Sequence, residues 1–265
     1  MTAPILLTGG TGTLGRLVSA RLRAAGSPVR VLSRRSHETE DGIELAVGDL
    51  VTGEGIEAAV TGVDTIVHCA GSAKGDDDKA RILVRAASAL GRPHIVYISV
   101  VGAERIPVVS RVDRAMFGYF ATKRAAEQVV SESGLPWTIL RATQFQELLF
   151  KVAQQMTKLP VVPVPAGFRF QPVAADEVAT GLVELALGNP AGLVPDIAGP
   201  RVYELSELIR GLLAASHKRR MLVPVRLPGK AAAAFRAGAN LAPDQAVGGR
   251  TWEDFLAERV PAARP

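Results

Sequence analysis

A glycine-rich stretch near the start of the chain has the residue types and spacing of an anion-binding turn. It reads Thr8-Gly9-Gly10-Thr11-Gly12-Thr13-Leu14-Gly15 and follows a short apolar run at 5–7. Gly10, Gly12 and Gly15 match G-x-G-x-x-G, whose glycines permit a tight turn and bring backbone N–H groups close to a pyrophosphate. Gly9, with Gly12 and Gly15, lies at the same junction and is an equal candidate for the first glycine. The N-terminus of the following helix favours the same negative charge. The stretch therefore predicts a dinucleotide site to which all eight residues contribute.

The end of the second apolar run bears on which dinucleotide would bind. Asp or Glu at this point hydrogen-bonds the ribose hydroxyls of NAD, whereas Arg accommodates the 2′-phosphate of NADP. The chain reads Ser33-Arg34-Arg35, and its first acid afterwards is Glu38. A guanidinium suits bidentate contact with a phosphate. We therefore predict NADP as the cofactor, with Arg34 the first candidate for the phosphate contact and Arg35, beside Ser33, the second. The alternative is a pair of solvated arginines.

Tyr119 and Lys123 form a pair that could move a proton. They are four residues apart in Tyr119-Phe120-Ala121-Thr122-Lys123, a spacing that places both side chains on one face of a helix. A phenol has an unperturbed pKa of about 10, and a nearby ammonium favours the phenolate, which suits the tyrosine to general acid or base catalysis. The competing interpretation is an ordinary amphipathic helix, with Tyr119 half-buried and Lys123 facing Glu127.

The elements that must position these residues alternate along the chain. Short apolar runs alternate with segments of helical period, which predicts an α/β fold with a doubly wound parallel sheet. Dinucleotides bind beyond the carboxyl ends of such strands. We expect a dinucleotide-binding core at 1–150, and at 151–265 the remaining sheet elements with a small, mostly helical C-terminal substrate cap. The expected strands are 5–7, 29–32, 44–47, 65–68, 94–99 and 138–141, and the expected helices are 14–25, 55–60, 77–90, 119–133, 176–187, 205–215, 229–237 and 251–259.

Composition narrows the classes of function. The chain has 265 residues, 48% of them hydrophobic and 22% charged, as expected of a globular protein with a buried core. Its single cysteine, Cys69, cannot form an internal disulfide, and no metal-ligand spacing is present, so we expect no metal. Residues 76–78 are all Asp, which we interpret as the cap and solvated first turn of the third helix.

The positive charge is unevenly distributed. Residues 1–200 carry 20 Lys and Arg against 20 Asp and Glu, whereas residues 201–265 carry 11 against 6. This balance argues against a basic groove for nucleic acid. No stretch supplies the roughly 20 apolar residues of a membrane span, and the N-terminus lacks the pattern of a signal peptide. We therefore expect a cytoplasmic protein with no nucleic-acid and no membrane partner.

Several segments together resemble a known family. The glycine turn, the Y-x-x-x-K of Tyr119 and Lys123, and the segment Ser131–Arg141 (SESGLPWTILR) are similar to the short-chain dehydrogenase/reductases, specifically the atypical, NmrA-like branch of NAD(P)-binding proteins with the Rossmann fold. The resemblance covers about residues 3–200. It implies that Lys123 also holds the nicotinamide ribose. Through Gly48-Asp49-Leu50 and Cys69-Ala70-Gly71 it further implies that Asp49 and Leu50 lie near the adenine and that Ala70 and Gly71 line the dinucleotide cleft.

Two positions depart from the pattern of that family. Its members usually carry a catalytic Ser or Thr just after the fifth strand, where this chain has Val101, so Ser99 is our candidate for the third catalytic residue. Many relatives carry Arg-Pro after the sixth strand, but here the segment reads Arg141-Ala142-Thr143-Gln144-Phe145. Gln144 is a candidate cofactor contact, and Phe145 a candidate substrate or cofactor contact.

These observations lead to one favoured hypothesis and two alternatives. The favoured one is an NADP-dependent oxidoreductase that transfers a hydride between NADPH and a carbonyl-type or quinone-type small molecule, with Tyr119 moving the proton and Lys123 positioning it. The alternatives are a non-catalytic, NAD(P)-sensing regulator of a partner protein and a nucleotide-dependent epimerase or dehydratase. The expected substrate pocket is apolar and is formed with the cap by Met116, Phe117, Phe145, Leu148 and Leu149.

Overall fold

The computed structural model describes residues 3–36, 42–72 and 75–260 of the chain. The chain divides into two compact units. Unit 1 consists of Met1–Ser99, Gly118–Arg141 and Asp176–Pro195, and unit 2 of Val100–Phe117, Ala142–Ala175 and Asp196–Pro265. Each unit is therefore assembled from separate stretches of chain.

Unit 1 is built on a seven-stranded sheet with the order β3-β2-β1-β4-β5-β6-β9. The pairs β1–β2, β1–β4, β2–β3, β4–β5 and β6–β9 are parallel. The order reverses at β1, where β2 lies on one side and β4 on the other, so the predicted doubly wound sheet is confirmed. The strands are β1 (Ile5–Thr8), β2 (Val29–Ser33), β3 (Ile43–Val47), β4 (Thr65–His68), β5 (His94–Val100), β6 (Trp137–Ala142) and β9 (Gly192–Leu193).

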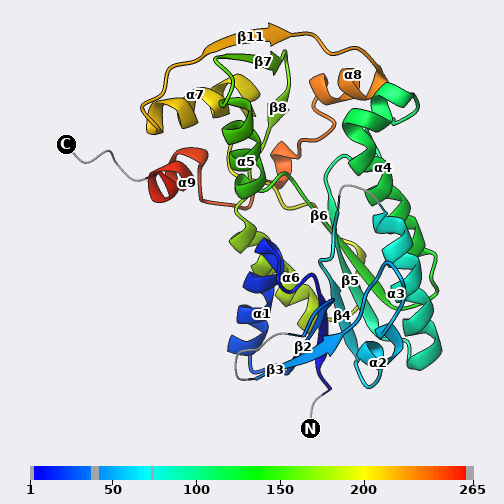
Figure 1. Cartoon of the computed structure of the whole chain (residues 1–265). Coiled ribbons are helices and arrows are strands. Elements are labelled where there is room, and N and C mark those ends of the chain that lie inside the picture. Colours follow the sequence, from blue (N-terminus) through cyan, green and yellow to red (C-terminus); the bar gives the residue numbers. More distant parts are fainter. Residues whose placement is uncertain (1–2, 37–41, 73–74, 261–265) are drawn as a thin grey trace. The chain divides into compact units, whose positions relative to one another are not determined.

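Helices cover both faces of this sheet. Figure 1 shows α1 and α6 on one face and α2, α3 and the unit 1 part of α4 on the other. Gly26 and Gly134, shortly after helices α1 and α4, have φ of 77° and 71°, in the left-handed region that glycine enters without steric cost. The helices are α1 (Thr13–Ala24), α2 (Ile56–Val60), α3 (Asp76–Leu90), α4 (Arg111–Ser131) and α6 (Ala175–Leu187).

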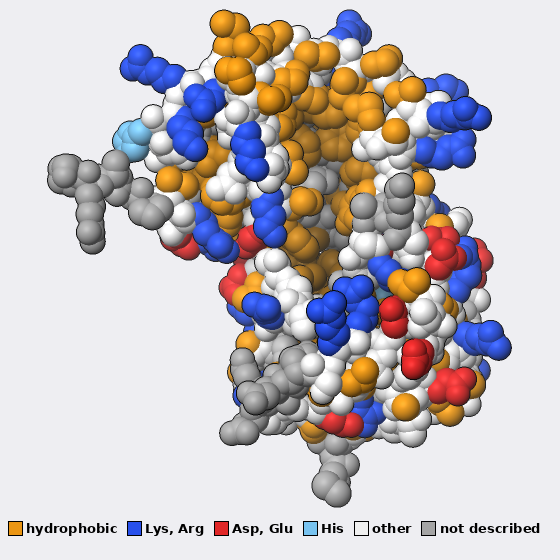
Figure 2. Space-filling model, viewed as in Figure 1, with side chains coloured by type: hydrophobic (Ala, Val, Ile, Leu, Met, Phe, Trp, Pro, Cys, Tyr) orange, Lys and Arg blue, Asp and Glu red, His pale blue; other side chains and the backbone are white. Residues whose placement is uncertain are grey.

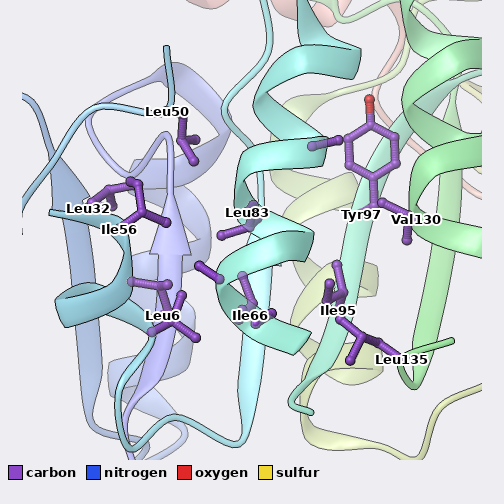
Figure 3. Packing of buried hydrophobic residues seen from close by; sticks show 14 of the residues in the cluster. Leu6, Leu32, Leu50, Ile56, Ile66, Leu83, Ile95, Tyr97, Val130 and Leu135 are labelled. Carbon is purple, nitrogen blue, oxygen red and sulfur yellow. The ribbon is translucent and has the colours of Figure 1, made fainter. Parts of the chain in front are cut away.

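One core cluster of unit 1 lies between the sheet and the helices α2, α3 and α4. β5 is buried along its whole length, as its continuous apolar run predicts for a central parallel strand. Figure 3 shows the side chains of the neighbouring strands pointing to one face and meeting those of the helices. Fully burying a Leu or Ile side chain contributes about 1.5–3 kcal/mol, so this cluster holds the strand ends in place. Its labelled members are Leu6, Leu32, Leu50, Ile56, Ile66, Leu83, Ile95, Tyr97, Val130 and Leu135.

Unit 2 combines helices with two small sheets. One sheet pairs β7 with β11 in parallel, and the other pairs β8 with β10 antiparallel. Phe168 and Phe235 stack with ring centroids 4.8 Å apart, and Phe117 lies 5.6 Å from Phe235. The elements are α5 (Gln146–Met156), β7 (Val161–Pro165), β8 (Arg169–Phe170), β10 (Tyr203–Glu204), α7 (Leu205–Ala215), β11 (Met221–Val225), α8 (Lys230–Arg236), a short 3₁₀ helix (Pro243–Gln245) and α9 (Trp252–Arg259).

The predicted elements match the structure unevenly. All six predicted strands are present, with ends within two residues of those expected. The fourth predicted helix begins at Arg111 instead of Tyr119, because the Ser110 hydroxyl accepts a hydrogen bond from the Asp113 N–H at 3.0 Å and so caps an earlier start. The Asp113 carboxylate in turn accepts from the backbone N–H of Ser110. Helix α5 and strands β7, β8, β9, β10 and β11 are additional to those predicted. None of the helices within the described residues is both long and apolar enough to span a membrane.

Candidate active site

The glycine turn connects β1 to α1, and three of its glycines have no room for a side chain. A Cβ on Gly9 would come within 2.8 Å of the Cys69 and Ala70 backbone, and Gly9 has a φ of 71°. A Cβ on Gly10 would come within 2.7 Å of the Val31 side chain. On Gly15 it would come within 2.1 Å of the Gly9 carbonyl oxygen, so α1 packs directly on the turn. Each glycine therefore serves the close packing that the fingerprint requires.

The start of α1 is open to a ligand. Gly12 is the N-cap residue and supplies no side-chain cap, and no acidic residue lies in the first turn. The Gly12 N–H donates to the Gly9 carbonyl oxygen at 2.9 Å, which closes the turn, while Thr11, Gly12 and Thr13 are exposed. An uncapped helix N-terminus presents N–H groups and a partial positive charge, the arrangement that holds a phosphate. The residues present therefore fit a dinucleotide.

Two arginines follow β2 as the sequence predicts. Arg34 and Arg35 are both exposed. The Ser33 hydroxyl donates to the Arg35 carbonyl oxygen at 2.9 Å and accepts from the Arg35 N–H at 3.3 Å, so Ser33 shapes the turn that presents both guanidinium groups. Glu38, the first acid after this strand, lies outside the described residues.

The ends of β3 and β4 contribute further predicted cofactor residues. Asp49 accepts a hydrogen bond from the Val51 N–H at 2.8 Å, while Leu50 is buried in the core cluster. At β4, the Ala70 N–H donates to the Thr8 hydroxyl at 3.2 Å, which ties the strand end to the glycine turn. A Cβ on Gly71 would lie only 3.3 Å from the Lys123 Nζ. Thr8, Ala70, Gly71 and Lys123 therefore form one continuous group.

Lys123 is the centre of a buried polar cluster. Its Nζ donates to the Tyr97 hydroxyl at 3.2 Å and to the Ile98 carbonyl oxygen at 3.1 Å, and it lies 3.2 Å from the Asp76 Oδ2. Its side chain is only 5% exposed. The same Nζ lies 5.9 Å from the centroid of the Tyr119 ring, so the predicted Tyr–Lys pair shares one face of α4. Tyr119 is 36% exposed and can reach a ligand.

The protonation states in this cluster follow from burial and charge. Burial alone would lower the pKa of Lys123, but its interactions with the Tyr97 and Tyr119 phenols and with the Asp76 carboxylate outweigh burial and raise that pKa, so the lysine is a cation. Desolvation raises the pKa of Tyr119, Lys123 acts to lower it, and Asp76 adds to the rise. The net direction is upward, and therefore Tyr119 is a protonated phenol at neutral pH, the state of a proton donor.

Two neighbours extend the cluster back to the glycine turn. The His68 Nδ1 lies 2.7 Å from the Thr8 hydroxyl, and its ring stacks on Tyr97 with centroids 5.4 Å apart. Burial lowers the pKa of His68 to about 3, so its imidazole is neutral. Burial raises the pKa of the Cys69 thiol to about 12, which leaves that thiol protonated, as expected of a packing residue.

Sequence reasoning missed the role of Asp76. The run Asp76, Asp77 and Asp78 predicts a cap and a solvated first turn, yet Asp76 is 1% exposed and pairs with Lys123. Its other oxygen accepts from the Ser72 N–H at 2.7 Å. The available signal was position, because α3 begins just beyond the carboxyl end of β4, where the ligand edge of the sheet lies. Tyr97 was assigned only to a buried strand and was missed for the same cluster.

Two further predicted site residues, Ser99 and Gln144, have buried polar side-chain atoms. Ser99 is 4% exposed, and its hydroxyl faces Glu127, whose carboxylate also takes both Arg141 hydrogen bonds at 2.7 Å. The Ser99 hydroxyl therefore lies beside the ion pair of Glu127 with Arg141. Gln144 belongs to unit 2, and both polar atoms of its amide are buried without a hydrogen-bond partner among the described residues. An unpaired buried amide is costly, which suits it to a polar ligand group.

The expected apolar pocket residues all belong to unit 2. Phe117 and Leu149 are buried, at 5% exposure each, whereas Met116 and Leu148 are exposed, at 45% and 50%. Phe145 is the N-cap of α5, and its backbone bridges to Val173. As for metals, no group of three or more His, Cys, Asp or Glu within the described residues is arranged to hold one.

The doubly wound sheet, the open helix N-terminus and the glycine turn define a dinucleotide-binding α/β protein. A family model described as NAD(P)H-binding matches residues 9–187. The chain therefore belongs to this NAD(P)H-binding family, in agreement with its resemblance to the atypical short-chain dehydrogenase/reductases.

Similar proteins agree with this assignment. A (4-alkanoyl-5-oxo-2,5-dihydrofuran-3-yl)methyl phosphate reductase of Streptomyces griseus is 30% identical over 77% of this chain and 70% of its own length. An NAD(P)H azoreductase of Xenophilus azovorans is 26% identical over 84% of this chain and 77% of its own length. The NADPH-dependent quinone oxidoreductase QOR2 of Escherichia coli, solved with NADPH, has the same fold with a TM-score of 0.80, 19% identity and coverage of 96% of this chain and 99% of its own.

Proposed function

We propose that the protein is an NADP-dependent oxidoreductase that reduces a carbonyl-type or quinone-type small molecule. The observation that carries the proposal is the placement of Lys123 beside Gly71, at the edge of the sheet where the glycine turn also lies. A protonated Tyr–Lys pair near the glycine turn supports a site that would bind a dinucleotide and move a proton. The reductases among its similar proteins, which include the phosphate reductase and the azoreductase named above, support the same class of reaction.

We assign the binding roles from the family resemblance together with the position of each residue. The backbone of Thr8 to Gly15 would hold the pyrophosphate, and Arg34, then Arg35, would contact the 2′-phosphate. Asp49 and Leu50 would lie near the adenine, and Ala70 and Gly71 along the nucleotide. Lys123 would hold the nicotinamide ribose, and the unpaired amide of Gln144 would take a polar group of the ligand.

The chain's own chemical step would be a proton transfer. When bound, NADPH supplies the hydride that reduces the acceptor. Tyr119 would give its phenolic proton to the oxygen that gains the electron pair, and the raised pKa keeps that proton in place until then. Lys123 would stabilise the resulting phenolate by its charge, and Asp76 and Tyr97 would keep the ammonium in position. We do not retain Ser99 in the proton-transfer step, because its hydroxyl faces Glu127.

A second candidate is a non-catalytic NAD(P) sensor, which is favoured by one observation. The chain carries Val101 at the position where the related enzymes usually carry a catalytic Ser or Thr to orient a carbonyl. A screen of aldehydes, ketones, quinones and azo dyes, followed by NADPH absorbance, separates the two candidates. Turnover of any acceptor supports the oxidoreductase, whereas tight NADPH binding with no turnover across the panel favours the sensor. The epimerase or dehydratase alternative predicts conversion of a nucleotide sugar without net NADPH loss.

A further inference from the structure

The small sheet of β7 and β11 in unit 2 exposes a face made only of apolar side chains. The two strands are in parallel register, with Met221 beside Val161, Val223 beside Pro163 and Val225 beside Pro165. Successive side chains of a strand point to opposite faces, so these six residues share one face. The opposite face of β7 carries Val162 and Val164, which are buried in unit 2.

The exposure of this apolar face is high. Met221 is 64% exposed, Val161 47%, Val223 38% and Val225 37%. An exposed sheet face in a monomeric protein usually carries polar residues at alternate positions, which keeps it solvated. Here neither VVPVP nor MLVPV contains a polar residue. A contiguous apolar patch of this kind marks an interaction surface.

The chain around this face is strongly basic. The segments 148–175 and 208–243, which carry β7 and β11, contain ten Lys and Arg and no Asp or Glu. Lys218, Arg219 and Arg220 immediately precede Met221, and Arg226 immediately follows Val225. Figure 2 shows hydrophobic side chains gathered over the part of unit 2 where Figure 1 draws β7 and β11, with Lys and Arg side chains nearby. Much of the excess of Lys and Arg in the chain therefore lies in the segments that carry β7 and β11.

We propose that this basic apolar face binds the surface of an anionic phospholipid membrane. Apolar side chains of a peripheral protein enter the boundary between headgroups and acyl chains, while neighbouring cations pair with acidic headgroups. A second copy of this chain is a poor occupant, because a symmetric contact would bring two sets of unbalanced cations together. The expectation that the protein has no membrane partner rested on the absence of a spanning segment, and a surface contact needs none.

The experiment is vesicle flotation with the full-length protein. Vesicles of phosphatidylcholine alone are compared with vesicles of phosphatidylcholine and phosphatidylglycerol, at low and at physiological salt. We expect binding to the anionic vesicles, at least about tenfold weaker binding to the neutral ones, and a decline with salt, because each cation near the surface contributes about 1 kcal/mol. Failure to float with anionic vesicles at low salt overturns the proposal.

Matched variants separate the apolar and the basic contributions. Met221→Glu with Val223→Glu removes the apolar contact, and Lys218→Glu with Arg219→Glu reverses charge beside it. Each pair should reduce binding about tenfold or more, since all four side chains are exposed and their replacement leaves the fold intact. The control, Leu90→Glu with Arg85→Glu on exposed positions of α3, should bind as the parent does.

Two further outcomes contradict the proposal. If the double variant of Lys218 and Arg219 loses binding while the double variant of Met221 and Val223 binds fully, the protein adsorbs non-specifically through its positive charge. Self-association in the absence of vesicles that disappears in the Met221 and Val223 pair would assign the face to a second copy of the chain. Sedimentation of the same variants without lipid measures this outcome, and their thermal unfolding shows that they remain folded.

Discussion

The Asp76 carboxylate lies 3.2 Å from the Lys123 ammonium, with the two side chains only 1% and 5% exposed. A buried ion pair of this kind contributes little net stability relative to apolar packing, yet removing one partner is costly because the other charge stays buried. The ion pair with Asp76 therefore holds the Lys123 ammonium in one position. In the proposed reaction, Asp76 is a positioning residue that acts on Tyr119 through Lys123 and through its own negative charge.

The first prediction concerns the pH dependence of Asp76→Asn. The Asp76 charge is one cause of the raised pKa of Tyr119, so its removal should lower that pKa. Reduction needs the protonated phenol, and therefore the alkaline limb of the rate profile should move to lower pH. We expect the variant to lose stability, by the order of 3 kcal/mol, because Lys123 keeps a buried charge. The measurement is NADPH oxidation as a function of pH, together with the ultraviolet titration of tyrosine.

The control for this prediction is Asp77→Asn. Asp77 is the residue after Asp76 in α3, but its carboxylate pairs with Arg81 at 3.0 Å, on the exposed side of the helix. Its replacement should leave the profile unchanged and cost less than about 1 kcal/mol. An alkaline limb that stays in place in Asp76→Asn, with the variant folded, would show that Asp76 does not act on Tyr119.

The second prediction distinguishes the two tyrosines near Lys123. Tyr119→Phe should lower turnover by about 10²- to 10⁴-fold, the usual contribution of a general acid, while NADPH binding is retained. Tyr97→Phe removes the hydroxyl that accepts from Lys123 at 3.2 Å, and its main effect should be on stability, by about 1.5–3 kcal/mol. Steady-state kinetics and denaturant unfolding of both variants measure these effects. The reverse pattern would make Tyr97 the proton donor.

The third prediction concerns cofactor choice. Arg34→Ala should weaken NADPH binding roughly tenfold to a hundredfold and leave NADH binding unchanged, since a hydrogen bond to a charged group is worth about 1.5–3 kcal/mol. Arg35→Ala should have a smaller effect, and Arg85→Ala on α3 none. Fluorescence titration with both cofactors measures the affinities. Equal affinities of the unaltered protein for NADPH and NADH would remove the basis for assigning a phosphate contact to either arginine.

The sequence predicts best what depends on local signals. The glycine turn and the six strands could be found because close-approach glycines and continuous apolar runs are visible within a few residues. Asp76 could not be distinguished from Asp77 and Asp78 in this way, because only packing against Lys123, which is distant in the sequence, buries it. The same holds for β11, whose partner β7 is far along the chain. Pairing between distant segments leaves no local pattern to read.

The fourth prediction concerns stability in acid and the pair of Glu127 with Arg141. Burial alone would raise the pKa of Glu127, but hydrogen bonds from Arg141, with Ser99 and Arg124 beside it, lower that pKa below the ordinary 4.5 of a glutamate. A carboxyl with a depressed pKa in the folded state stabilises the fold above pH 4.5, and that contribution is lost as pH falls through the folded value. Arg141→Met should therefore cost about 3–5 kcal/mol near neutral pH.

The pH dependence of this loss is the decisive part. In Arg141→Met, burial raises the pKa of Glu127, so the carboxyl takes up a proton at a higher pH. The free energy of unfolding of the variant therefore falls less on acidification than that of the parent. The difference in unfolding free energy should therefore narrow as pH falls from about 7 to below about 4.5, as measured by urea unfolding at several pH values. Arg124→Ala is the control, because its guanidinium is 44% exposed and contacts the same carboxylate at 3.1 Å, so it should cost less than about 1 kcal/mol. A difference that is constant with pH would mean that Arg141 acts by packing and not through the charge of Glu127.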